Sequence, residues 1–467
     1  MSLASLRVQH GAHGDAARRR LRRIACGLAE IASGTGERAL AQRNAVLAFG
    51  VRVASAAILF LSQVAIARWM GGHDYGVYVY AWTWVLVLGG LSTLGLNVAA
   101  IRLVPHYRET GELAALRGLL LGGRLQTFIV ASGVSGVVAL ALWLAAGWFP
   151  GAHFVPLWLA LLAVPAYALS DVQDGICRGS ARILSATFPP YILRPLLILG
   201  SLAALHVLEL PLAASSAVLA AVLATWLAFG VQTLIVERGV VANVPRGPRE
   251  YRIAEWLSTS MPLLLICACE LALQNTDVIV ISHLLSPTEA GIYFAAAKTM
   301  GLIMFVYYAV GSAMANRFAA ISARGDAAAL RATVRDAVRW TFWPSLAVGL
   351  IMLAAGRPLL SLFGPRFVDG YPVMCILILA FLVRASIGPV DFLLNMSGGQ
   401  AACARSLCIA AVLNLVLDLA LVPLAGINGA AIAVALSLIA GAALNYRVAC
   451  DRLGFDIGIW AARNPAT

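Results

Sequence analysis

Eight ionisable side chains lie well inside long apolar stretches of the sequence, where a charge is costly. They are the cations Arg52, Arg194, Lys298 and Arg384 and the acids Glu270, Asp277, Asp391 and Asp418. Inside a bilayer an ionised side chain costs from a few to about ten kcal/mol unless it faces water or a partner, so each position needs a reason. Buried cations can neutralise phosphate groups, and carboxylates can take up a proton or a sodium ion.

The same charges have a second interpretation, in which they pair with one another. Arg384 and Asp391 are seven residues apart, as are Glu270 and Asp277. On a continuous helix this spacing places each pair on one face, separated by about 10 Å along the axis. We therefore treat the cations as candidates for a substrate-binding cavity, and the acids as candidates for ion coupling or for charge pairs.

Prolines mark places where these apolar stretches can bend. The hinge candidates are Pro189, Pro190, Pro262 and Pro389, and the first two precede Arg194 by about one turn. Proline removes a backbone hydrogen bond from a helix and kinks it. A hinge at a binding site and an ordinary kink of a membrane helix are both consistent with this pattern.

The composition predicts a membrane protein. Of the 467 residues 61% are hydrophobic and 12% charged, and the mean hydropathy is +0.85; a soluble domain is roughly half apolar and about a quarter charged. The net charge of +12 then gives no reason to expect nucleic acid as a partner. The eight cysteines form no CxxC pair and accompany no histidine cluster, so we expect neither a disulfide framework nor a metal site, and no cofactor.

Twelve stretches are long and apolar enough to cross a bilayer, which takes about 20 residues of helix. Their approximate limits are 44–67, 78–101, 125–148, 154–172, 184–206, 211–236, 255–282, 288–316, 340–356, 372–396, 405–424 and 427–446. None keeps a strict period of two, so the sequence predicts helices. The fold class that we expect is an all-α polytopic membrane protein.

The distribution of arginine predicts the orientation of these helices. With the N-terminus in the cytoplasm, 27 of the 34 basic residues fall on the cytoplasmic side and only Arg68, Arg357 and Arg366 on the outer side. Cytoplasmic loops carry such a basic excess, so we expect both termini in the cytoplasm. The segment after the N-terminal arginines is too polar for a cleavable signal peptide. The loops are too short for a catalytic domain, and no phosphate-binding loop for ATP is present.

An internal repeat relates the two halves of the chain. A shift of 215 residues aligns Gly76-Val77-Tyr78 with Gly291-Ile292-Tyr293, and Arg102 with Arg317, without a gap. Six helices in each half make the repeat parallel, with a pseudo-two-fold axis along the membrane normal. We expect a cleft between two six-helix bundles that opens alternately to either face of the membrane.

These observations divide the chain into five predicted regions. They are a cytoplasmic basic N-terminal arm (1–43), an N-terminal six-helix bundle (44–236), a cytoplasmic linker (237–254), a C-terminal six-helix bundle (255–447) and a cytoplasmic tail (448–467).

Motifs in the first two helices of each half resemble those of a known group. The first half carries Arg52, Gly71-Gly72-His73-Asp74, Tyr75-Gly76-Val77-Tyr78 and Gly95-Leu96-Asn97, and the second half carries Asn275-Thr276-Asp277-Val278-Ile279-Val280 and Ala290-Gly291-Ile292-Tyr293-Phe294-Ala295-Ala296-Ala297-Lys298. They resemble the polysaccharide-transporter branch of the multidrug, oligosaccharidyl-lipid and polysaccharide exporter superfamily. The resemblance implies the exporter fold of two pseudo-symmetric bundles, as in multidrug and toxin extrusion (MATE) transporters.

The resemblance also implies a function. Similar proteins are O-antigen and exopolysaccharide flippases of the bacterial inner membrane, which move undecaprenyl-diphosphate-linked oligosaccharides from the cytoplasmic to the periplasmic leaflet. By this resemblance we expect a non-enzymatic, monomeric flippase whose partners are the lipid-linked oligosaccharide, membrane lipid and other polysaccharide-assembly proteins of the membrane.

Other functions remain open at this point. One is a membrane-embedded polysaccharide polymerase, ligase or acyltransferase. Another is a multidrug or small-molecule antiporter of the same superfamily, or a flippase for peptidoglycan precursors. Drug exporters of the superfamily commonly carry an acid in the first helix, whereas this chain has Arg52 and no acid between Arg43 and Arg68. The sequence leaves the sugar and the driving force undetermined.

Overall fold

The computed structural model describes residues 37–144 and 151–460, with backbone only at 37–49, 51–53, 151–153 and 316. Within these ranges the regular elements are helices, without a strand. The chain divides into two units, Met1–Ala57 and Ile58–Thr467. Helix α2 begins in the first unit, and every contact described below lies within the second. The predicted basic arm, 1–43, lies mostly outside the described residues.

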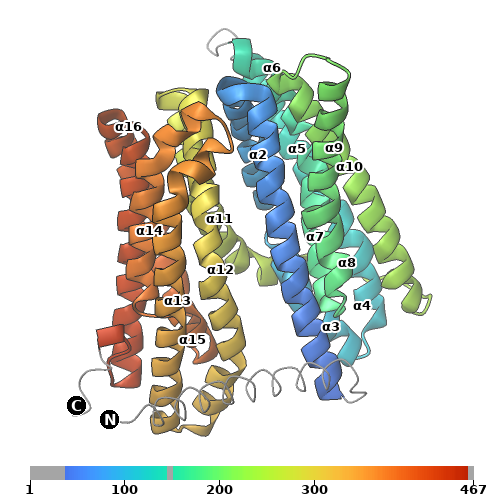
Figure 1. Cartoon of the computed structure of the whole chain (residues 1–467). Coiled ribbons are helices and arrows are strands. Elements are labelled where there is room, and N and C mark those ends of the chain that lie inside the picture. The colour runs from blue at the N-terminus through green and yellow to red at the C-terminus, as the bar shows by residue number, and fades with distance from the viewer. Residues whose placement is uncertain (1–36, 145–150, 461–467) are drawn as a thin grey trace, which may run out of the picture. The chain divides into compact units, whose positions relative to one another are not determined.

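The first group of helices runs from α2 to α10. It comprises α2 (Glu37–Ser92), α3 (Leu96–Glu109), α4 (Leu113–Gly118), α5 (Arg124–Leu144), α6 (Gly151–Leu161), α7 (Val164–Gly179), α8 (Ile183–Phe188), α9 (Arg194–Val207) and α10 (Ala214–Gly239). A π-helical turn joins α4 to α5 (Leu119–Gly123) and another joins α8 to α9 (Pro189–Leu193), and a 3₁₀ turn (Val241–Asn243) follows α10. Figure 1 labels these helices.

The second group of helices runs from α11 to α16. It comprises α11 (Ile253–Leu284), α12 (Pro287–Arg324), α13 (Ala327–Ser361), a 3₁₀ turn (Pro365–Gly370), α14 (Tyr371–Ala385), α15 (Val390–Met396) and α16 (Gln400–Leu453). The starts of α12 and α13 are capped, because the side chains of Ser286 and Asp326 accept hydrogen bonds from the backbone N–H groups of Glu289 and Ala329.

Two long helices fold back on themselves at a glycine. In α2 the backbone of Gly71 is left-handed (φ 79°), and Tyr75 donates a hydrogen bond to Gln63, twelve residues earlier, at 3.0 Å. In α16 the break is at Gly426 (φ 59°). Without a Cβ, glycine adopts these angles at little cost.

The fold-backs reconcile the structure with the predicted number of spans. Nine of the described helices, or ten with the bent pair α6 and α7, are long and apolar enough to cross a membrane. Counting the two legs of α2 and of α16 separately gives twelve. An all-α polytopic membrane fold is thereby confirmed.

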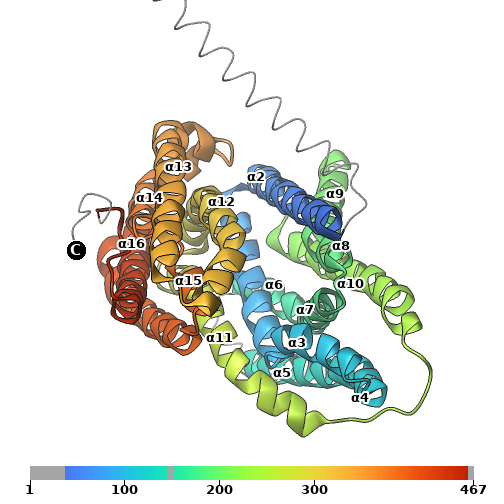
Figure 2. The ribbon, with the colours of Figure 1, turned by 90° about the horizontal axis from the view of Figure 1, so that it is seen from below.

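Helices pack mainly within their own group. In the first group α3 and α5 contact α7, and α10 contacts α6, α7 and α9. In the second, α12 contacts α13 and α14, and α16 contacts α11, α14 and α15, as the side-by-side ribbons of Figures 1 and 2 show. Helix α11 also packs against α3 of the first group.

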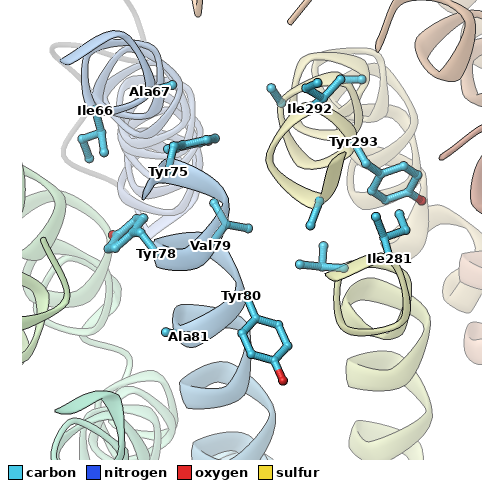
Figure 3. Close-up of a cluster of buried hydrophobic side chains, with 14 of the residues drawn as sticks. Ile66, Ala67, Tyr75, Tyr78, Val79, Tyr80, Ala81, Ile281, Ile292 and Tyr293 are labelled. Carbon is cyan, nitrogen blue, oxygen red and sulfur yellow. The ribbon is translucent and has the colours of Figure 1, made fainter. Parts of the chain in front are cut away.

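The largest buried apolar cluster includes residues of both groups. Figure 3 shows Tyr75, Tyr78 and Val79 of α2 in this cluster, together with Ile281 of α11 and Ile292 of α12. The backbones of α2 and α12 come very close here. A Cβ added at Gly76 would lie only 1.8 Å from the carbonyl oxygen of Pro287. Gly76, a glycine of the predicted repeat, is therefore required here because a larger residue would collide with the start of α12.

The linker between α10 and α11 is held against the first group. Arg117 of α4 donates hydrogen bonds of 2.8 Å to the carbonyl oxygens of Pro245 and Pro248, and the backbone N–H of Glu250 donates to Ala114 at 2.9 Å. Figure 2 shows this linker passing α4 before α11 begins. These contacts position the start of α11 beside α3.

Candidate functional site

Arg194 is held between two aromatic rings in the first group. It is the first residue of α9, directly after the π-helical turn that contains Pro189 and Pro190. Its guanidinium carbon lies 5.5 Å from the ring centre of Trp82 on α2 and 5.2 Å from that of Tyr167 on α7. The ring faces stabilise the charge without using the N–H donors, because a cation interacts with an aromatic face through its electrostatic field.

The guanidinium of Arg194 has no carboxylate within ion-pairing distance among the described residues. It is half-buried and lies within the apolar helix segment Ile183–Val207. A half-buried cation that is oriented by aromatic rings and forms no ion pair can bind an anionic ligand.

Arg384 in the second group has a different environment. It forms an ion pair of 2.5 Å with Asp391 and lies 4.6 Å above the ring of Tyr307. Asp391 also accepts hydrogen bonds from Tyr307 at 2.9 Å and from Asn445 at 2.6 Å. The charge of this arginine is therefore neutralised within its own helix group.

A helix break explains this ion pair. A continuous helix would separate Arg384 and Asp391 by about 10 Å along its axis. Instead α14 ends at Ala385 and α15 begins at Val390, with Gly388 in the left-handed region (φ 69°) and Pro389 at the start of α15. The chain turns between the two residues, and this turn brings the side chains into contact.

Of the other two predicted cations, Lys298 and Arg52, the structure describes the side chain of Lys298 alone. Lys298 of α12 is exposed in the isolated chain, and its ammonium lies 4.9 Å from the ring centre of Phe294. It too has no acid within ion-pairing distance in the described part of the chain. Arg52 belongs to α2, but its side chain lies outside the described residues.

Two of the four predicted acids meet in a buried cluster of the second group. Asp277 of α11 accepts hydrogen bonds from Tyr293 at 2.6 Å and from the amide of Asn414 at 2.8 Å. The same amide donates to Asp418 at 2.9 Å, and both Asn414 and Asp418 belong to α16. The exposed fractions are 6% for Asp277, 1% for Asn414 and 0% for Asp418.

This acidic cluster has unused acceptors and no basic partner in ion-pairing range among the described residues. The Oδ1 atoms of Asn414 and Asp418 are buried without a hydrogen-bond donor. Two ionised carboxylates joined by one amide repel each other, so a proton or a monovalent cation is needed to neutralise them. The cluster can therefore bind and release such an ion.

The remaining predicted site residues stand apart from this cluster. Glu270 is exposed, and no ion pair is found for it in the described ranges. Pro262 lies inside α11 and Pro389 directly precedes α15, whereas Pro189 and Pro190 are buried in the π-helical turn before Arg194. The prolines thus stand at helix irregularities, except Pro262, which is part of a helix that continues through it.

Sequence reasoning missed two acids of the first group. Asp171 of α7 accepts a hydrogen bond of 2.7 Å from Asn97, and Asp174 forms a 2.8 Å ion pair with Arg178. The predicted fourth span ended at residue 172, but α7 continues to Gly179. Asp171 follows Tyr167 by four residues and shares its helix face, but only the structure shows that this face lies next to Arg194.

A polar network joins α3 to the start of α11. Tyr107 donates a hydrogen bond of 2.7 Å to Glu255 and accepts one of 3.2 Å from Trp256, and Arg252 pairs with Glu112. Burial and the bond to Glu255 raise the pKa of Tyr107 to about 12, so this phenol remains a donor at neutral pH.

The site therefore has two chemically distinct parts. An arginine oriented by aromatic rings is available for an anion in the first group, and a buried acid pair is available for a proton or cation in the second. A transporter that uses an ion gradient instead of ATP to move an anionic cargo needs both an anion site and an ion site.

Solved structures with a similar fold are transporters. An inward-facing multidrug resistance MATE family transporter of the MOP superfamily is 13% identical, with a TM-score of 0.69, and the match covers 90% of this chain and 100% of that one. The lipid II flippase MurJ, in an inward closed conformation, is 15% identical with a TM-score of 0.62, covering 86% of this chain and 87% of MurJ.

A MOP superfamily transporter from Pyrococcus furiosus, described as having a binding pocket of reverse polarity, is 12% identical with a TM-score of 0.61, and the match covers 87% of this chain and 94% of that one. These similarities show that the fold is that of MATE and MurJ transporters. A comparison with curated protein sequences finds no match.

A family model decides the relationship by sequence. The model described as polysaccharide biosynthesis protein matches residues 41–319, which is more than half of the chain. The match includes both repeats of the glycine and tyrosine motif as well as Arg194 and Asp277. The chain is therefore a multi-pass membrane protein that belongs to the polysaccharide biosynthesis protein family.

Proposed function

We propose that the protein is a flippase for an undecaprenyl-diphosphate-linked oligosaccharide, an O-antigen or exopolysaccharide repeat unit. It moves this lipid from the cytoplasmic to the periplasmic leaflet of the bacterial inner membrane by alternating access, with both termini in the cytoplasm. The polysaccharide family supports the sugar cargo, and the structural similarity to a lipid II flippase supports a lipid-linked precursor.

The observation that carries this proposal is the environment of Arg194. A diphosphate brings about two negative charges into a medium of low dielectric, where a cation is worth far more than in water. Arg194 lies inside an apolar helix segment, is oriented by Trp82 and Tyr167, and keeps its N–H donors. Lys298 and Arg52 are further candidates for the same cavity, whereas Arg384 is committed to Asp391.

We further propose that Asp277 and Asp418 couple transport to an ion gradient. Their buried carboxylates share the amide of Asn414, and acceptor atoms of Asn414 and Asp418 remain free for a proton or an alkali cation. Binding of the ion neutralises the pair, and its release restores the repulsion between the acids. The two charge states therefore favour different packing of α11 against α16, which is a means of driving the conformational cycle.

The test is to replace Arg194 by glutamine in the organism that encodes the chain. Surface polysaccharide is measured together with the lipid-linked oligosaccharide that remains in the cell. We expect surface polysaccharide to be lost and the lipid-linked oligosaccharide to accumulate, while the protein is present in the membrane at the normal level.

Arg357→Gln is the matched control, since Arg357 also lies above a tyrosine, at 5.3 Å from the ring of Tyr371, but is exposed. Export should be normal in this variant. Normal export by Arg194→Gln would refute the role of Arg194 as the phosphate anchor.

A second assay separates transport from catalysis. The purified protein in vesicles receives fluorescent undecaprenyl-diphosphate-linked oligosaccharide, and both leaflet location and product mass are recorded. Movement without a new product supports a flippase, whereas chain elongation would identify a polymerase or ligase. Efflux of cationic drugs with no movement of the lipid would identify an antiporter.

A further inference from the structure

Two free cysteines of the second group lie with their sulfur atoms in contact. The Sγ atoms of Cys269 on α11 and Cys408 on α16 are 2.9 Å apart, and both side chains are half-buried. A disulfide requires a separation of about 2.05 Å, so the two atoms need to approach by less than about 1 Å. Neither residue takes part in the anion site or the acidic cluster.

The cysteines and the acidic cluster connect the same two helices. Cys269 precedes Asp277 by eight residues on α11, and Cys408 precedes Asn414 by six on α16. The hydrogen bond of 2.8 Å between Asp277 and Asn414 is thus a second connection, about two turns further along. α11 and the first leg of α16 therefore run parallel, joined at two levels.

Helix α11 is also held by the first group. A Cβ at Gly95 would lie 2.4 Å from the carbonyl oxygen of Ser260, and a Cβ at Gly90 would lie 2.6 Å from Leu271. These contacts are van der Waals packing, which yields when helices slide. A disulfide from Cys269, on the opposite face of α11, to Cys408 of α16 would keep these two helices in register.

We propose that Cys269 and Cys408 form a reversible dithiol–disulfide site that responds to peroxide and fixes α11 to α16. Hydrogen peroxide oxidises one thiol to a sulfenic acid, and the first water molecule leaves. The second thiol attacks this sulfur, the S–S bond forms and a second water molecule leaves. The two electrons pass to the peroxide, whose O–O bond is broken, and a dithiol reductant reverses the reaction.

The test uses the purified full-length protein in lipid nanodiscs. After treatment with peroxide and removal of the excess, the denatured protein is labelled with a maleimide polymer that adds one mass tag to each free thiol. The wild type has eight cysteines, and we expect two fewer tags after oxidation, with the full number restored by dithiothreitol. Peptide mass spectrometry should identify the Cys269–Cys408 crosslink.

Cys267→Ser is the matched control, because Cys267 lies two residues away on the same helix and is also half-buried. This variant should form the crosslink as the wild type does, whereas Cys269→Ser and Cys408→Ser should not. Absence of the crosslinked peptide from the oxidised wild type, or equal tag loss in Cys269→Ser, would overturn the site.

Amide hydrogen exchange tests whether the bond fixes the helices, and it requires no knowledge of the cargo. Exchange in Ile253–Leu284 should be slower in the oxidised wild type than in the reduced protein, and equal in oxidised and reduced Cys408→Ser. A fully crosslinked protein whose α11 exchanges as rapidly as the reduced form would contradict the fixing of α11.

Discussion

Arg194 and Arg384 show how one residue type takes two roles in the two helix groups. Both belong to apolar helices and both lie above a tyrosine ring, at 5.2 Å and 4.6 Å. Among the described residues only Arg384 forms an ion pair, with Asp391, whereas Arg194 has a second aromatic ring in that place. An arginine inside a membrane is therefore not in itself a ligand site, and its partner decides whether the charge is available.

The acids of the second group differ in the same way. Asp391 is neutralised by an arginine, while among the described residues Asp277 and Asp418 contact an amide, a hydroxyl and each other's carboxyl, but no basic group. The first arrangement is suited to holding helices together, and the second to exchanging an ion. Four predictions test these distinctions between structural and functional charges, beginning with the largest expected effect.

Replacing Arg384 by methionine should lower the free energy of unfolding by about 2–4 kcal/mol, because it leaves Asp391 without its counter-charge. The range of the destabilisation extends down to about 2 kcal/mol because the pair is partly exposed, by 19% for the Arg384 side chain and 30% for that of Asp391. Arg194→Met should cost less, about 1–2 kcal/mol, the value of a desolvated cation–π contact, because it leaves no ion-paired carboxylate without its counter-charge.

Unfolding in detergent, followed by tryptophan fluorescence, measures both effects. The double variant Arg384→Met/Asp391→Asn should regain part of the lost stability. Equal destabilisation by the two single variants would remove the distinction between a structural and a ligand-binding arginine.

Asp418→Asn should leave stability unchanged or raise it by about 1 kcal/mol, since it removes repulsion from Asp277. Transport should lose its dependence on the proton or sodium gradient. Asp391→Asn is the comparator, and it should lower stability instead. Transport is measured for both variants in vesicles with an imposed proton or sodium gradient. Full dependence of Asp418→Asn on the gradient would exclude the acidic cluster as the coupling site.

Trp82→Leu should slow export by about five- to thirtyfold, because a desolvated cation–π contact is worth about 1–2 kcal/mol. Arg194 would keep its charge and lose one of the two rings that orient it. The initial rate of lipid movement in vesicles measures the change, with Trp143→Leu, an exposed tryptophan of α5, as control. An unchanged rate in Trp82→Leu would show that the ring does not position the anchor.

Lys298→Met should have the smallest effect, about a twofold to fivefold decrease, since exposed cations contribute about 0.5–1 kcal/mol. Its side chain is exposed in the isolated chain, and in the water-filled cavity that we propose it would be screened by salt, so the decrease should diminish as ionic strength rises. Vesicle assays at two salt concentrations check this. A loss as large as that of Arg194→Gln would place Lys298 beside it as a principal anchor.

Sequence reasoning was most successful where the signal was local. The apolar stretches predicted helical spans, and even the fold-backs at Gly71 and Gly426 left the predicted spans in place. The glycine and tyrosine repeat aligned Gly76 with Gly291, and in the structure each of these glycines lies against the helix that carries the other. The limits of the two bundles and the orientation in the membrane stay predictions.

The charged site was harder to predict, because pairing depends on where helices break. Arg384 and Asp391 meet only because the chain turns between Ala385 and Val390. Asp174 went unnoticed because α7 extends beyond residue 172, where the predicted span ended. No spacing in the sequence brings Trp82, Tyr167 and Arg194 together.

The sequence by itself determined that this chain crosses a membrane many times, because about 20 apolar residues suffice for a span wherever they occur. It also determined which ionisable groups are buried at a cost. The tertiary structure alone decided which of those groups are neutralised, since an ion pair requires contact within about 4 Å. Asp277 and Asn414 reach such contact from positions 137 residues apart in the sequence.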